Sequence, residues 1–456
     1  MSDITVKQKE FFGHPIGLYV LFFTEMWERF SYYGMRAILV LYLVGKTTDV
    51  NSGMGWSQAE ALSLYGWYTM LVYVASIPGG IIADKVLGQK KSVMLGGLIL
   101  VAGHGILAVT ELWAFYTGLG LIIVGVGLLK PNISTMVGGL YKQGDIRRDK
   151  AFTIFYIGIN LGAFLASLVV GYVGEKIGWH YGFGLAGIGM LMGQSVYFYG
   201  QKYLTHVGNF IGDSKTVEGK KLQNSSLTKI EKDRIIVLLL SFLIVIVFWG
   251  AFEQAGGLMN IYTSEKTDRV LSFSLPLIGN TVPASWFQSL NAFFIIILGT
   301  GVASIWAKRK LKNKEASSLF KMAIGTMIMG FGFLFMTAAA AQFDTEGSSA
   351  MYWLVLAYLF HTIGELCSSP VSLSFITKLS PAKYSSIMMG IYFAMTGFGN
   401  KLAGILGESA SELGEYTIFT GIAIFCMLFG LLIIVFLKKL KVLTHGAEDN
   451  EFEVSN

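Results

Sequence analysis

The stretch Glu-Met-Trp-Glu-Arg-Phe-Ser-Tyr-Tyr-Gly-Met-Arg occupies residues 25–36 and lies inside a long apolar run. At ~100° per residue, a helix places Glu25, Arg29, Tyr32 and Arg36 on one stripe, with Glu28 beside it. Burying an ionisable group at membrane depth costs roughly 2.5–3.5 kcal/mol even on the lenient insertion scale. Such a cluster must therefore face a protein interior or a water-filled path, which favours a transporter or a channel.

The composition supports a membrane protein. The chain of 456 residues is 53% hydrophobic and only 14% charged, against about 25% charged residues in average soluble domains. Its mean hydropathy is +0.58. Gly is abundant at 55 and Pro scarce at 7, as expected where helices pack closely through small residues. These numbers predict an all-α polytopic membrane protein.

Apolar stretches of about 20 residues, long enough to cross a bilayer, recur along the whole chain. Twelve spans are predicted, at residues 15–45, 58–83, 92–112, 114–141, 151–174, 180–203, 234–262, 284–307, 317–341, 350–377, 384–408 and 415–437.

Lysine and arginine gather after every even-numbered span. Examples are Lys90 after span 2, Arg147 after span 4 and Lys438 after span 12. The positive-inside rule then puts both termini in the cytoplasm. The net charge of +6 is mainly this orientation signal and does not indicate nucleic-acid binding.

One long polar segment divides the chain. We predict an N-terminal six-helix bundle over 1–203, a cytoplasmic linker over 204–233, a C-terminal six-helix bundle over 234–440 and a cytoplasmic tail over 441–456. A linker between two six-span halves matches an architecture in which substrate binds at the midplane between bundles.

Charged residues in the apolar spans suggest a dipolar ligand. The first half offers Arg29 and Arg36 in span 1 and Lys130, a single base in an apolar run of span 4. The second half offers Glu253 and Glu365, each in an apolar helix. A zwitterion needs an anionic partner for its amino end and a cationic one for its carboxylate. Positive groups in one bundle and negative groups in the other could hold such a ligand.

A glycine-rich motif follows span 2. Residues 79–91 contain Gly79-Gly80-x-x-Ala83-Asp84-x-x-x-Gly88-x-x-Lys91, which resembles the signature loop of the major facilitator superfamily. The resemblance implies twelve spans in two six-helix bundles and makes Asp84 a gating residue rather than a substrate contact. A generic tight turn is the alternative interpretation.

Further motifs resemble the proton-coupled oligopeptide transporter (POT/PTR) family within that superfamily. Span 1 carries Glu25-x-x-Glu-Arg-Phe-x-Tyr-Tyr-Gly, and span 5 carries Phe155-Tyr-x-x-Ile-Asn-x-Gly. Spans 7, 8 and 10 add Phe-Glu253-Gln, Trp286-Phe-Gln-Ser-Leu-Asn and Glu365-x-Cys-x-Ser-Pro. The resemblance runs from residue 13 to about residue 440.

The resemblance implies two groups of substrate-binding residues. On the carboxylate and backbone side it places Tyr32, Tyr33, Arg36, Tyr73, Lys130 and Asn160, and on the amino side Asn291, Glu365 and Ser369. It also implies two ion pairs across the bundles, Arg36–Glu253 and Lys130–Glu365, with Glu253 acting as a gating residue.

Proton coupling is expected in span 1. Burial raises the affinity of a carboxyl for protons, and a neighbouring base lowers it. An acid–base pair that opens and closes can therefore act as a proton switch. Glu25, Glu28 and Arg29 are our candidates, and Glu365 is a further group that could be protonated. Structural pairing of Glu25 with Arg29 at i, i+4 is the plain alternative and does not exclude coupling. Gly66 stands where some family members have a histidine.

The predicted function is proton-coupled import of di- and tripeptides by alternating access. Alternatives are symport of another small solute, such as an anion, a drug or a glucoside, and a receptor that does not transport. The six histidines have no metal-binding spacing and no catalytic arrangement is present, so we expect no enzyme activity, no metal and no cofactor beyond the proton. We expect a monomer in the bacterial inner membrane whose partners are peptides, protons and lipid, with no nucleic acid.

Overall fold

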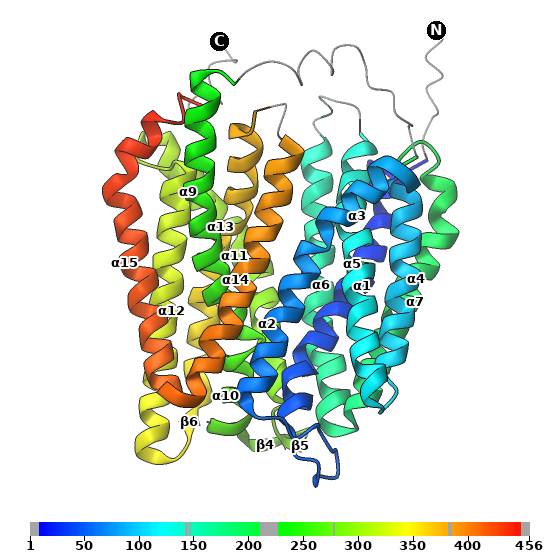
Figure 1. Ribbon diagram of the computed structural model, residues 1–456, viewed down its shortest axis with the longest axis vertical. Coiled ribbons are helices and arrows are strands. Elements are labelled where there is room, and N and C mark those ends of the chain that lie inside the picture. The colour runs from blue at the N-terminus through cyan, green and yellow to red at the C-terminus, as the bar shows by residue number, and fades with distance from the viewer. Residues whose placement is uncertain are drawn as a thin grey trace. The chain divides into compact units, whose positions relative to one another are not determined.

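A computed structural model describes residues 9–141, 145, 147–209, 227–276, 279–381 and 385–447. Long helices dominate this part of the chain, with three two-stranded sheets beside them (Figure 1). The chain separates into two compact units. Unit 1 comprises Met1–Leu39 and Val74–Asp213, and unit 2 comprises Val40–Tyr73 and Ser214–Asn456.

The described part of the first half of the chain forms a short hairpin and seven α-helices. Its elements are β1 (Glu10–Phe11), β2 (His14–Pro15), α1 (Ile16–Val44), α2 (Gln58–Val74), α3 (Ser76–Ile82), the π-helical turn η1 (Ala83–Leu87), α4 (Gln89–Leu107), α5 (Leu112–Gly139), α6 (Arg147–Lys176), α7 (Trp179–Gly200) and the 3-10 turn η2 (Gln201–Tyr203). The border between the units falls inside α1 and near the end of α2, so each of these helices contributes to both units.

Within the described residues, the second half of the chain contains seven α-helices and two small sheets. Its elements are α9 (Lys229–Phe252), the 3-10 turn η3 (Glu253–Ala255), α10 (Leu258–Lys266), β3 (Thr267–Asp268), β4 (Val270–Leu275), β5 (Gly279–Thr281), the 3-10 turn η4 (Ala284–Gln288), α11 (Ser289–Leu311), α12 (Ser318–Glu346), β6 (Ser349–Ala350), α13 (Met351–Leu379), α14 (Ser385–Leu413) and α15 (Glu415–Val442). β3 pairs parallel with β6, and β4 pairs antiparallel with β5.

The helices follow the twelve predicted spans with small shifts at their ends. The third span ends at Leu107 rather than at residue 112. The seventh begins at Lys229, inside the segment predicted as linker, because Thr228 and Glu231 form a capping box that starts α9 there. The remainder of that segment at 210–226 lies outside the described residues. The predicted domain limits stay a prediction.

Nine helices or helix runs among the described residues are long and apolar enough to cross a membrane. The long helices outside this set are α1, α7 and α14. α1 carries Glu25, Glu28, Arg29 and Arg36, whereas α7 and α14 are rich in glycine and polar residues. The chain is therefore a multi-pass membrane protein, and α1 falls outside the set because of its charged residues.

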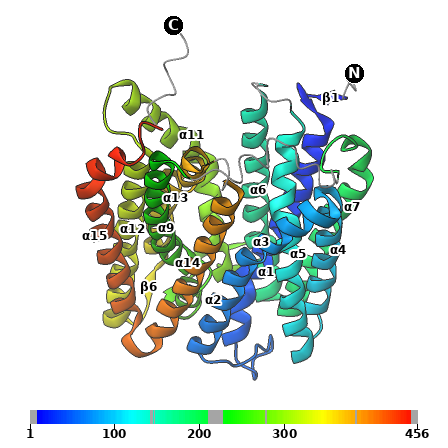
Figure 2. The same ribbon diagram turned by 45° about the horizontal axis from the view of Figure 1, so that its top comes forward.

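In unit 1, α4 packs against α5 and α7 (Figures 1 and 2). α6 approaches α1 closely at Gly162, where an added Cβ would lie 2.2 Å from the carbonyl oxygen of Met26 and 3.1 Å from Cβ of Arg29. Only glycine fits at such a crossing. The glycine of the span-5 motif thus brings α6 against the charged part of α1.

In unit 2, α12 packs between α13 and α15, and α9 packs against α14 (Figure 2). One apolar core joins these five helices, with residues such as Phe242, Met322, Phe375, Tyr392 and Leu437. Close packing of this kind holds a rigid helical frame around the polar residues described below.

Candidate functional site

Three ionisable residues of α1 form a buried cluster. Glu25, Glu28 and Arg29 are at most 3% exposed. Nε of Arg29 lies 3.1 Å from Oε1 of Glu25, one helical turn away, and Arg29 also pairs with Glu28. One helix therefore supplies both acids and the base that compensates them, as the stripe in the sequence predicted.

Two tyrosines continue this cluster along α1. The guanidinium of Arg29 lies 5.6 Å from the ring centre of Tyr32 and 6.0 Å from that of Tyr33. The guanidinium of Arg36 lies 5.4 Å from the same Tyr33 ring. Arg36 is itself buried. Cations over aromatic faces are stabilised, so the tyrosines hold both arginines in place.

Two neighbouring helices add polar side chains to unit 1. Lys130 of α5 interacts electrostatically with Glu25, Glu28 and Arg29, which places it near the cluster. Asn160 of α6 is buried and donates a hydrogen bond of 2.9 Å to the carbonyl oxygen of Tyr156 in its own helix. Gly162, two residues further on, is where α6 meets α1.

In unit 2, a carboxyl group joins two helices. Nδ2 of Asn291 on α11 donates to Oε2 of Glu365 on α13 at 2.7 Å and to Oγ1 of Thr362 at 3.2 Å. Ser369 lies one turn after Glu365 and is half-buried. The structure thus brings together Asn291 and Glu365, two of the three residues predicted for the amino side of a substrate.

A second carboxyl of unit 2 contacts α2. The hydroxyl of Tyr65 donates to Oε1 of Glu253 at 2.5 Å. Tyr73, predicted on the carboxylate side, lies in unit 2 near Gly397 of α14. Gly66 follows Tyr65, and an added Cβ there would lie 2.9 Å from Cα of Gly404. A histidine has no room at this position while α2 contacts α14.

The predicted pairs Arg36–Glu253 and Lys130–Glu365 each connect a residue of unit 1 with one of unit 2. They stay predictions. Asp84 lies in η1 and is exposed, and the structure gives it no hydrogen bond or ion pair with any described residue. Its role in gating also stays a prediction.

Sequence reasoning missed two residues of the site. Tyr65 carried no signal, because a tyrosine in an apolar helix usually packs in the core. Thr362 could have been found, since it lies three residues before Glu365 on the same helical face. Nζ of Lys401 on α14 lies 4.6 Å from the ring centre of Trp67 on α2.

The chain is similar to known membrane transporters. A family profile described as the POT family matches residues 90–232 and 213–418. An uncharacterized transporter of Bacillus subtilis, YclF, is 38% identical over 437 residues, covering 85% of this chain and 87% of the relative. A di-/tripeptide transporter of Lactococcus lactis subsp. cremoris is 35% identical over 450 residues, covering 86% and 89%.

The fold is also similar to solved structures. A crystal structure of a peptide transporter POT variant in complex with alafosfalin has a TM-score of 0.87 and 34% identity, covering 96% of this chain and 97% of that one. The major facilitator fold, with twelve transmembrane helices in two six-helix bundles, is therefore confirmed.

Proposed function

This chain belongs to the POT family, and on that premise we propose that it imports di- and tripeptides together with protons by alternating access. One observation supports the substrate class most directly. The buried Arg36 and the half-buried Lys130 belong to unit 1, whereas the carboxyl of Glu365 with its donor Asn291 belongs to unit 2.

A peptide carries the complementary charges. Its carboxylate is bound by Arg36 and Lys130, its amino group by Glu365 with Asn291, and its backbone by the amide of Asn160. Tyr32, Tyr33, Tyr73 and Ser369 complete the lining. A ligand bound at both of its ends contacts residues of both units. Its binding can therefore shift the conformational equilibrium of the transport cycle.

Protons act on the cluster of α1. Protonation of Glu28 or Glu25 removes a negative charge from its contact with Arg29. Arg29 then stays paired with the other carboxylate, and its contacts shift toward that side because a buried charge must stay compensated. Charge neutralisation at Glu28 is thereby coupled to a rearrangement of α1, which also carries Arg36. Asp84 and Glu253 act as gating residues.

The proposal places the protein in the bacterial inner membrane as a monomer, with both termini in the cytoplasm. The proton is its only coupling species, and no metal or other cofactor takes part. The mechanism makes and breaks no covalent bond, so the protein acts as a transporter and not as an enzyme.

Uptake of radiolabelled dialanine into proteoliposomes, with and without an inward proton gradient, tests this function. We expect accumulation that needs the gradient and that excess unlabelled trialanine abolishes, whereas free alanine has little effect. Uptake of an anion, a drug or a glucoside, without competition by peptides, would show that the substrate belongs to that class and is not a peptide. Peptide binding without accumulation would instead indicate a receptor.

A further inference from the structure

The first described residues form a tight hairpin before α1. β1 pairs antiparallel with β2, and the two residues between them, Phe12 and Gly13, have φ of 47° and 76°. Two positive φ values are typical of a two-residue hairpin turn. The amide of Ile16 donates to the carbonyl oxygen of Lys9 at 2.9 Å, so the hairpin is tied to the first turn of α1.

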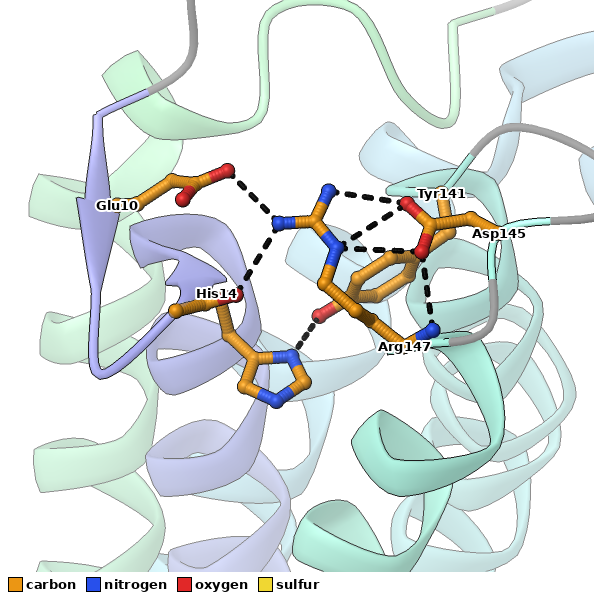
Figure 3. A network of polar contacts seen from close by, with 6 residues as sticks. Glu10, His14, Tyr141, Asp145 and Arg147 are labelled. Atoms are coloured by element: carbon orange, nitrogen blue, oxygen red, sulfur yellow. Dashed lines mark hydrogen bonds and ion pairs between the residues drawn. The ribbon is translucent and has the colours of Figure 1, made fainter.

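Arg147, at the start of α6, contacts this hairpin (Figure 3). Its Nη1 donates to Oε1 of Glu10 at 2.9 Å and to the carbonyl oxygen of Gly13 at 3.1 Å. Its Nε and Nη2 donate to Asp145 in the loop before α6, at 3.1 and 2.9 Å. Arg147 and Glu10 are 41% and 47% exposed, and exposed pairs contribute little stability. The contacts of Arg147 therefore orient the hairpin but contribute little to its stability.

The other half of the contact is buried. Nδ1 of His14 lies 2.7 Å from the hydroxyl of Tyr141, just after α5, and their rings meet edge to face at 5.9 Å (Figure 3). His14 and Tyr141 are only 3% and 7% exposed. A buried hydrogen bond is costly to lose, so this pair anchors the hairpin.

We call residues 10–15 with Tyr141, Asp145 and Arg147 the N-terminal clasp. The clasp joins the start of α1 to the end of α5 and the start of α6. These three helices carry the unit 1 site: the charge cluster on α1, Lys130 on α5 and Asn160 on α6. The clasp therefore sets the relative positions of the helices that must act together.

Protonation of His14 weakens the clasp. Burial first, then the positive charges of Lys150 and Arg147 on α6, lower the pKa of His14 below its usual value, and the acids Glu10 and Asp145 oppose this less strongly. Within the described residues, the ring also contacts the hydroxyl of Tyr141. A lowered pKa in the docked form means that docking is stable above the ordinary histidine pKa of about 6.5 and weakens as the pH falls below it.

We propose that His14, Tyr141 and Arg147 are positioning residues, and that the N-terminal clasp slows peptide transport when the solution on its side of the membrane becomes acidic. This proposal rests on the proposed function and on the cytoplasmic location of the N-terminus. Each symport cycle delivers protons to that side, so release of the clasp limits further import as the interior acidifies.

Dialanine exchange between proteoliposomes and medium at equal pH on both sides tests the proposal, because it needs no gradient and is independent of orientation. Between about pH 7.5 and about pH 5.5, we expect the rate of the wild type to fall roughly twofold or more relative to His14→Gln, which cannot titrate. The control His180→Gln, at the start of α7, should follow the wild-type profile. Superimposed profiles for wild type and His14→Gln would overturn the proposal.

Hydrogen–deuterium exchange gives a readout that does not depend on transport. After correction for intrinsic rates, the amides of residues 10–16 should exchange faster below about pH 6.5 in the wild type but not in His14→Gln. Tyr141→Phe should speed this exchange at neutral pH as well. Equal protection at all pH values would refute the clasp. Absence of dialanine exchange in every variant, with the expected deuterium result, would refute the transport function alone.

Discussion

The carboxyl groups of the two units differ in where their partners come from. In unit 1, Glu25 and Glu28 contact Arg29 within one helix, one turn and one residue away. In unit 2, Glu253 and Glu365 accept hydrogen bonds from Tyr65 and Asn291, which are 188 and 74 residues distant in sequence. The ion pairs of the unit 1 cluster are thus local to one helix, with the charge of Lys130 on α5 nearby, whereas the unit 2 contacts are joints between helices.

This difference indicates a division of work. A proton that reaches the α1 cluster changes the charge of one helix without breaking a contact between helices. A ligand that competes for Glu365 or Glu253 instead disturbs the packing of one helix on another. Proton coupling is therefore better suited to unit 1, and recognition of the peptide's amino group to unit 2.

The largest effect is expected for Arg29→Gln, which leaves two buried carboxyls without their base. Breaking a buried ion pair from one side destabilises by about 3–5 kcal/mol, and we expect a loss of that order in the unfolding free energy in detergent. The double variant Glu28→Gln/Arg29→Gln should recover part of it. Equal stability of Arg29→Gln and wild type would show that the cluster is not a charge balance.

A second test concerns Glu365→Gln. The amide oxygen of glutamine can still accept the Asn291 hydrogen bond, so stability should change by no more than about 1 kcal/mol. Dialanine affinity should fall roughly 10- to 100-fold, because a hydrogen bond to a charged group contributes about 1.5–3 kcal/mol. Competition binding measures the affinity, with exposed Glu412→Gln as the matched control. Unchanged affinity would show that the amino group of the peptide does not bind at Glu365.

A smaller effect is expected for Tyr65→Phe, which removes the donor to Glu253 and keeps the ring. Losing a buried hydrogen bond to a charged group costs about 1.5–3 kcal/mol in unfolding free energy. The exposed Tyr116→Phe should cost almost nothing. If the two residues act as one joint, Tyr65→Phe and Glu253→Gln will be less than additive when combined; strict additivity would contradict the joint.

The smallest effect is expected at the start of α9, outside both sites. Thr228→Ala removes one half of the capping box with Glu231 and should lower stability by about 1 kcal/mol. Thr228→Ser should restore it, and dialanine uptake should be the same in all three proteins. A large loss of uptake in Thr228→Ala would show that the comparison cannot separate site effects from general stability.

The same contrast explains how much could be predicted from the sequence. The spans and the α1 cluster are local patterns, so hydropathy and helical spacing were enough to find them. The Tyr65–Glu253 contact and the packing of Gly66 on Gly404 depend on which helices become neighbours, and no local pattern reports that. The N-terminal hairpin was missed because its turn residues, Phe12 and Gly13, are not a common turn pair, and Arg147 was interpreted only as an orientation charge.

The central claim is that the α1 cluster couples protons and that peptide binding does not need this coupling. Glu28→Gln tests it most directly, measured for dialanine exchange at equal pH and for accumulation under an inward proton gradient. The account predicts exchange near the wild-type rate and loss of accumulation. Retained accumulation, or equal loss of both activities, would contradict it.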